Sequence, residues 1–286
     1  MRLRTVVILG YVLVIGFLIG AWSMQIVPEF IEQQAIFAAL STLSNAEEGQ
    51  YAHAEKVLFD SGYDGMLYLL QELLRKPHES NVELRGDEVY DSAPFRERFR
   101  TAQFRVARLA RQIVTHLRES GEAFKPGKVY TANERLAEDT TLMELWRGRD
   151  DAIVINQMVT LLSLLPDPKD PAAEQLVEAL VAIGDPAIPG MVIQLKREKV
   201  DPVFAQPTAT QTKAEREREL NELNQLARLR VVSALEQIAT PRAVSELEAH
   251  RNVDDPVVAK AVRGALAEIL ENNPDAAATP DAEPQQ

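Results

Sequence analysis

Residues 179–189 read Ala-Leu-Val-Ala-Ile-Gly-Asp-Pro-Ala-Ile-Pro, a helix end followed directly by a helix start. Glycine is favoured just after a helix, and aspartate before proline is typical of a helix N-terminus. The pattern Ala-Leu-x-x-Ile returns at residues 234–238, where Ala-Thr-Pro follows, and again at residues 265–269. The sequence therefore predicts a repeated pair of helices joined by a tight turn.

The spacing of this motif predicts a stacked array. The second and third copies are 31 residues apart, whereas the first and second are 55 apart, which places an inserted loop at about 198–223. A period of about 31–35 residues with two helices per unit is typical of an α-solenoid, in which neighbouring units bury the apolar face that one pair leaves exposed. The alternative is an irregular helical bundle whose motifs are similar by chance.

Several helix starts carry an acceptor side chain before proline. The side-chain oxygen accepts a backbone N–H of the first turn, and proline there loses no needed donor. The predicted N-caps are Asp170, Asp185, Thr240 and Asp255.

The motif at 179–189 resembles the turn of a HEAT-type repeat, close to the short bacterial HEAT-like variety. Residues 255–258, Asp-Pro-Val-Val, look like the start of another such unit. The resemblance covers residues 166–271 and implies a curved scaffold with a protein-binding concave face; it implies no catalytic residues. Residues 50–165 keep the rhythm of helix pairs but lack the turn motif, so they are either degenerate repeats or an unrelated helical region.

The N-terminus predicts a membrane anchor. Residues 5–28 carry no charge, and as a helix they exceed the ~30 Å thickness of a bilayer's hydrocarbon core. Arg2 and Arg4 precede this segment, so the positive-inside bias puts residues 1–4 in the cytoplasm and the bulk of the chain outside it, in a periplasm if there are two membranes. The alternative is a signal peptide cleaved near Ser23, followed by secretion.

The complete prediction is an all-α chain: antiparallel helix pairs stacked as a solenoid, preceded by one transmembrane helix. Residues 29–49 are predicted to form a stalk helix that leaves the membrane. Residues 272–286 are mostly Asn, Pro, Asp, Ala and Gln, which predicts a disordered tail.

Composition and motifs argue against several classes of function. The chain has 286 residues, a net charge of −12 and no cysteine, which excludes disulfides and thiol chemistry and disfavours nucleic-acid binding. The four histidines have no metal-ligand spacing, and no phosphate loop or nucleophile elbow is present. We therefore expect no cofactor, no metal and no small-molecule substrate.

One helix, predicted over residues 94–119, has an arginine-rich polar face. An aromatic residue among arginines is a common composition at interfaces, so this face is a candidate docking surface for an acidic partner or anionic lipid; the alternative is an ordinary solvated face. The candidate residues are Arg98, Arg100, Phe104, Arg105, Arg108 and Arg111.

The expected function is a membrane-anchored scaffold or adaptor, not an enzyme, which binds another protein in an envelope assembly. The alternatives are an enzyme or enzyme subunit, such as a lyase, built on a HEAT-like scaffold, and a purely structural spacer.

Overall fold

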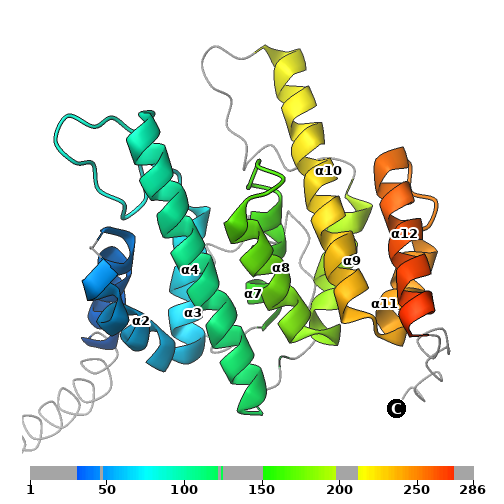
Figure 1. Ribbon diagram of the computed structural model, residues 1–286, viewed down its shortest axis with the longest axis horizontal. Helices are drawn as coiled ribbons and strands as arrows, with labels where there is room; N and C mark the ends of the chain where they lie inside the picture. The colour runs from blue at the N-terminus through cyan, green and yellow to red at the C-terminus, as the bar shows by residue number, and fades with distance from the viewer. Residues whose placement is uncertain (1–30, 46–47, 122–123, 125–150, 198–211, 274–286) are drawn as a thin grey trace, which may run out of the picture.

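The computed structural model describes residues 31–45, 48–121, 124, 151–197 and 212–273 (Figure 1). Every regular element in these ranges is a helix, which confirms the all-α prediction. The predicted anchor (5–28), residues 125–150 of the helical region predicted at 50–165, and residues 274–286 of the predicted tail lie outside them. The elements are a helix over 31–45, η1 (Glu48–Gln50), α2 (Tyr51–Asp60), α3 (Gly62–Leu74), α4 (Ala93–Glu119), α7 (Asp151–Leu162), α8 (Pro171–Ile183), η2 (Asp185–Ala187), α9 (Ile188–Lys196), α10 (Lys213–Ile238), α11 (Pro241–Ala249) and α12 (Pro256–Asn272).

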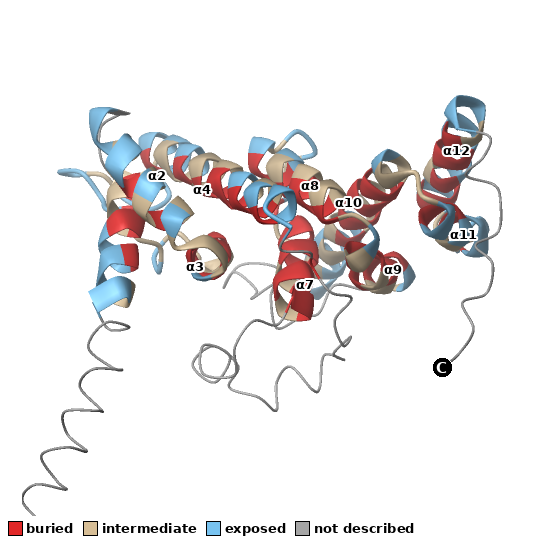
Figure 2. Cartoon of the chain, turned by 90° about the horizontal axis from the view of Figure 1, so that it is seen from below, coloured by how far each residue is buried: buried red, intermediate tan, exposed pale blue. Residues whose placement is uncertain are grey.

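The helices stack in two layers that follow the order of the chain. One layer is α4, α8, α10 and α12, each packed on the next, and the other is α3, α7, α9 and α11 (Figures 1 and 2). Buried residues face the space between the layers, and exposed residues cover the outside (Figure 2). Such packing between successive neighbours is how a repeat protein buries a core that no single helix pair could enclose.

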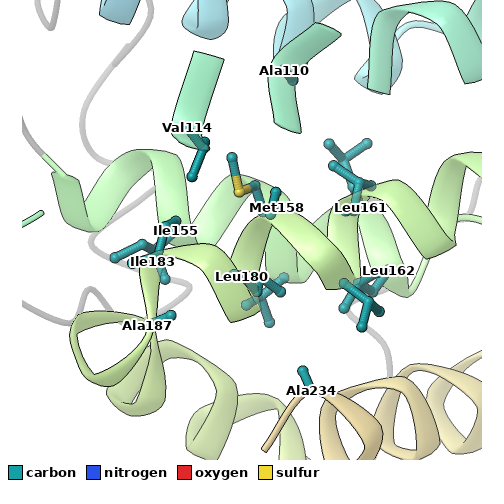
Figure 3. Close-up of a cluster of buried hydrophobic side chains, with 14 of the residues drawn as sticks. Ala110, Val114, Ile155, Met158, Leu161, Leu162, Leu180, Ile183, Ala187 and Ala234 are labelled. Carbon is teal, nitrogen blue, oxygen red and sulfur yellow. The ribbon is translucent and has the colours of Figure 1, made fainter. Parts of the chain in front are cut away.

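The hydrophobic core runs through nearly the whole array as one cluster. Near its middle, Met158 and Leu161 of α7 lie between Ala110 and Val114 of α4 and Leu180 of α8 (Figure 3). The repeated Ala-Leu-x-x-Ile motifs lie on α8, α10 and α12, which are successive helices of one layer. The alanine and leucine of each copy are buried, so the motif marks equivalent packing positions.

The helix at 31–45 belongs to this core. Ile36, Leu40 and Leu43 are buried in the main cluster, and the Phe37 ring meets Tyr68 of α3 edge-on at 5.0 Å between centroids. We predicted a stalk over residues 29–49, but the described part of this segment packs as the first helix of the array because its apolar stripe finds a partner surface on α3.

None of the described helices has by itself the length and apolarity required to cross a bilayer. Residues Pro171–Ile183 and Asp185–Lys196 meet that requirement only as a pair, with a bend of 113° between them.

The predicted caps hold at three of four positions. Asp170, Thr240 and Asp255 each accept a backbone N–H in the first turn of the following helix. The prediction that Asp185 is an N-cap was wrong. Asp185 is the first residue of η2 and follows Gly184, whose φ of 75° favours glycine. The Oδ1 atom of Asp185 instead accepts a 2.6 Å hydrogen bond from the Thr240 hydroxyl. Two copies of the turn motif, 55 residues apart, are thus joined directly.

The last part of the segment predicted as an inserted loop, at about 198–223, is helical. Thr212 and Glu215 form a capping box that starts α10 at Lys213, so residues 213–223 are helix, and their charged run extends α10. The side-chain and backbone hydrogen bonds from Thr212 lower the pKa of the Glu215 carboxyl from its usual value.

Arg230 of α10 makes three hydrogen bonds to backbone carbonyls in the interior of the array. Its side chain is 8% exposed and donates to the carbonyls of Leu162 at 2.8 Å, Leu165 at 2.7 Å and Asp167 at 2.5 Å. These carbonyls belong to the end of α7 and the turn toward α8, where a helix leaves acceptors unpaired. Burial lowers the pKa of Arg230, opposed by the carboxylates of Asp170 and Asp167. Arginine stays protonated nonetheless, so this clamp remains charged at all ordinary pH values.

Helices α2 and α3 cross at Gly65 too closely for any side chain. A Cβ atom there would lie 2.1 Å from the carbonyl oxygen of Leu58. We therefore expect Gly65→Ala to lower the free energy of unfolding by about 1–3 kcal/mol, because α3 must move away from α2. Chemical denaturation measures the change. Gly264→Ala, on α12 with open space around its Cα, is the control and should be neutral or stabilising; equal effects of the two substitutions would contradict this packing.

A carboxyl pair joins α10 and α12. Partial burial, together with a hydrogen bond to Glu268 and that group's charge, raises the pKa of Glu236 above its usual 4.5. The folded state therefore binds this proton more tightly than the unfolded chain. Its stabilising contribution is complete below pH 4.5 and is lost as the pH rises through the raised value.

Glu236→Gln should consequently raise the stability at neutral pH and flatten the loss of stability above pH 4.5. Thermal melts across the pH range measure this, with Glu271→Gln at the exposed end of α12 as the control. A parallel pH profile for wild type and Glu236→Gln would show that the two carboxyls do not interact.

Candidate partner-binding groove

An open groove lies between the N-terminal turns of α4 and the start of α8, where α4 extends beyond α8. Helices α4, α8, α10 and α12 have their N-termini at one edge of the array, and the longer α4 and α10 extend past the shorter α8 (Figure 1). The α4–α8 groove has a volume of about 540 Å³. Its lining is the first turns of α4 and the start of α8: Ala93, Arg96, Glu97, Arg100, Thr101, Phe104 and Pro171.

Most of the predicted arginine face is already engaged within the protein. Arg98 donates to the Glu88 carboxylate at 2.5 Å and to the Glu83 carbonyl. The Arg105 guanidinium lies 4.3 Å from the centroid of the Tyr51 ring.

Two further arginines join α4 to other helices. Arg108 binds Glu55 of α2 at 2.5 Å, and Arg111 binds Glu178 of α8. These pairs hold α4 against both neighbours, so Arg98, Arg105, Arg108 and Arg111 do not form one open cationic surface with the rest. Of the six predicted residues, the structure brings two into the groove, Arg100 and Phe104.

Arg100 is the predicted residue best placed to meet another molecule. Its side chain is 66% exposed, and its nearest acid is Asp167, at 4.0 Å. Arg96, one turn earlier, is also exposed and lines the same groove. The Phe104 ring is half-buried in the lining, so the groove combines guanidinium groups with an aromatic surface.

The sequence missed the remaining lining residues for two different reasons. Ala93 and Glu97 share a helical face with the predicted Arg100 and Phe104, so helical spacing is the signal that could have grouped them. Pro171 comes from α8, and no local pattern places it beside α4.

The wall of the groove is fixed by the loop that precedes α4. The Glu72 carboxylate, 5% exposed, accepts hydrogen bonds from the Ser80 hydroxyl at 2.7 Å and from the Asn81 backbone and side chain, both at 2.8 Å. Asn45 accepts from the backbone N–H of Glu83 at 2.7 Å. Because Arg98 also binds this loop, the start of α4 is tied to α3 and to the helix at 31–45 through it.

A second hollow, of about 450 Å³, lies between the projecting turns of α10 and the start of α12. Its lining is mostly polar and mixed in charge: Ala214, Glu217, Arg218, Asn221, Glu222, Gln225 and Asp255. Partial burial raises the pKa of Asp255, but hydrogen bonds from Gln225 and from the N–H groups of Val258 and Val257 outweigh it, and the pKa is lowered overall. The two bonds from Val257 and Val258 cap α12, so Asp255 has a structural role.

The described residues contain no group of three or more histidines and acids that could hold a metal ion. In comparisons with known proteins, no family model, no curated protein and no solved structure matches this chain.

Proposed function

We propose that this chain is a membrane-tethered, HEAT-like helical scaffold that holds another protein at the outer side of a membrane. The observation that carries the proposal is the two-layered stack of helices with a cationic, partly apolar groove open along one edge. Stacked helices give a rigid surface, and a tether raises the local concentration of that surface near the bilayer.

The assignment to HEAT-like repeats is supported by the packing of the turn motif. Its three copies lie on successive helices of one layer, and two of its turns are hydrogen-bonded to each other through Asp185 and Thr240. The tether is supported by the uncharged segment at residues 5–28.

A binding role is supported over catalysis by the chemistry of the groove. Its polar side chains are two arginines, one glutamate and one threonine. Guanidinium groups beside an aromatic ring are the composition of an interface.

Crosslinking in intact cells, followed by purification of the full-length protein from membranes and mass spectrometry, tests the proposal. A protein partner recovered in fixed proportion, and lost from a variant lacking the soluble array, is the expected result. A chain recovered alone from the membrane fraction would argue for a spacer or an enzyme, and recovery in the soluble fraction without residues 1–23 would overturn the tether.

A further inference from the structure

We infer that the α4–α8 groove binds an acidic peptide segment in which a bulky apolar side chain neighbours the carboxylates. The inference rests on the proposed scaffold function and adds the chemistry of the partner.

The charge of the groove supplies the first argument. Its lining has two guanidinium groups and one carboxylate, and it is therefore cationic in a chain whose net charge is −12. Within the described residues, the Arg96 guanidinium has no ion-pair partner, and Arg100 reaches only Asp167, at 4.0 Å. The other arginines of α4 that we predicted to dock already have partners within the protein: Arg98 pairs with Glu88, Arg105 lies on the Tyr51 ring, and Arg108 and Arg111 pair with Glu55 and Glu178.

The apolar lining supplies the second argument. Phe104, Pro171 and Ala93 offer ring and methyl surface beside the two arginines. The neighbouring Phe95 is fully buried, so its ring is not available to a partner, whereas Phe104 is only half-buried. A segment with carboxylates alone would leave the apolar surface of Phe104, Pro171 and Ala93 exposed to solvent. A segment with apolar side chains alone would leave Arg96 and Arg100 without a carboxylate from the partner.

The rigidity of the groove supplies the third argument. The buried Glu72 network fixes the loop before α4, and Arg98, Arg108 and Arg111 fix the helix itself. The N-terminus of α8 is fixed by the Asp170 cap. A preformed site loses little conformational entropy on binding, which favours recognition of a short segment.

A bilayer surface fits these observations less well than a peptide. Recognition of anionic lipid usually involves clusters of four to eight cations on one face. Here two guanidinium groups lie in a concave site that also holds Glu97, on a strongly acidic chain.

The test selects short random peptides displayed on phage against the full-length protein in detergent. We expect enrichment of sequences that place Asp or Glu beside Leu, Ile or Phe. In fluorescence titrations, an enriched peptide should bind the double variant Arg96→Glu with Arg100→Glu at least ~10-fold more weakly than wild type. Phe104→Ala should weaken binding as well.

The control is Arg118→Glu, which makes one such charge reversal at the exposed far end of α4 and is compared with the single variant Arg100→Glu. The Arg118→Glu variant should bind as wild type does. A peptide whose acids are replaced by Lys or Arg should in turn bind the double variant better than wild type, a gain that a misfolded variant could not produce.

The outcomes separate this inference from the proposed function. Enriched peptides that are basic or uncharged, or affinity unchanged by the groove variants, would overturn the peptide assignment even if a partner is recovered from membranes. Groove-dependent peptide binding without any recovered partner would uphold the groove chemistry and reject the scaffold role. Binding of vesicles with equal parts phosphatidylglycerol and phosphatidylcholine, lost in the double variant while no peptide is enriched, would reassign the groove to lipid.

Discussion

Replacement of Arg230 by methionine is expected to lower the free energy of unfolding by about 3–5 kcal/mol. Methionine keeps most of the length and apolar volume, but it leaves the carbonyls of Leu162, Leu165 and Asp167 without the donor they have in the interior. The buried carbonyls of Leu162 and Leu165 then lose their hydrogen bonds without gaining water, and the part-buried carbonyl of Asp167 loses its bond to the arginine. Denaturant unfolding of the full-length protein in detergent, followed by circular dichroism, measures the loss.

Two further variants isolate the cause. Arg230→Lys should lose an intermediate amount, because one ammonium cannot reproduce the fork that serves three carbonyls. Arg242→Met, an exposed arginine on α11, should leave the stability unchanged. If Arg230→Met stayed within about 1 kcal/mol of wild type, as surface substitutions do, the clamp would not be what fixes the end of α7.

Nothing in the sequence distinguishes Arg230 from the other arginines of α10. Arg218 and Arg228 lie in the same charged, helical pattern, and the acceptors of Arg230 are more than sixty residues away along the chain. A local pattern reports which face of a helix is apolar, but it does not report which carbonyls a distant helix end leaves open. The same limit applies to the candidate site, where the partners of Arg108 and Arg111 come from α2 and α8.

The helices and their register were predictable because their signals are local. Thr240 and Asp255 cap helices where the acceptor-before-proline rule placed them, and the apolar stripe of α4 from Phe95 to Leu117 lies inward, with Phe99 partly buried. The rule fails at Asp185 because a donor from another part of the chain competes with the local backbone N–H groups. That donor is the hydroxyl of Thr240, which only the packing of the two turns brings close enough. Similarly, the segment after residue 28 was predicted as a stalk because the partner surface for Ile36 and Leu40 lies on another helix.

The repeated Ala-Leu-x-x-Ile motif predicts that Leu235 is a core residue whose truncation strongly destabilises the protein. This residue is fully buried in the second copy of the motif, on α10, a helix that packs on both α8 and α12. Leu235→Ala should lower the free energy of unfolding by roughly 2–5 kcal/mol, because it removes buried methyl groups and leaves a cavity that rigid helices fill poorly. Thermal and denaturant melts of the full-length protein measure the change.

The location of the damage is as informative as its size. In a stacked array each unit is stabilised by its immediate neighbours, so a cavity on α10 weakens the contact that joins α11 and α12 to the rest. Hydrogen exchange should therefore rise in α11 and α12 more than in α3 and α4. Gln237→Ala, on the exposed side of the same helix, should change neither stability nor exchange. A Leu235→Ala variant with an unchanged melt would show that the motif does not mark the packing positions between units, and exchange raised equally from α3 to α12 would show that the array unfolds as one cooperative bundle.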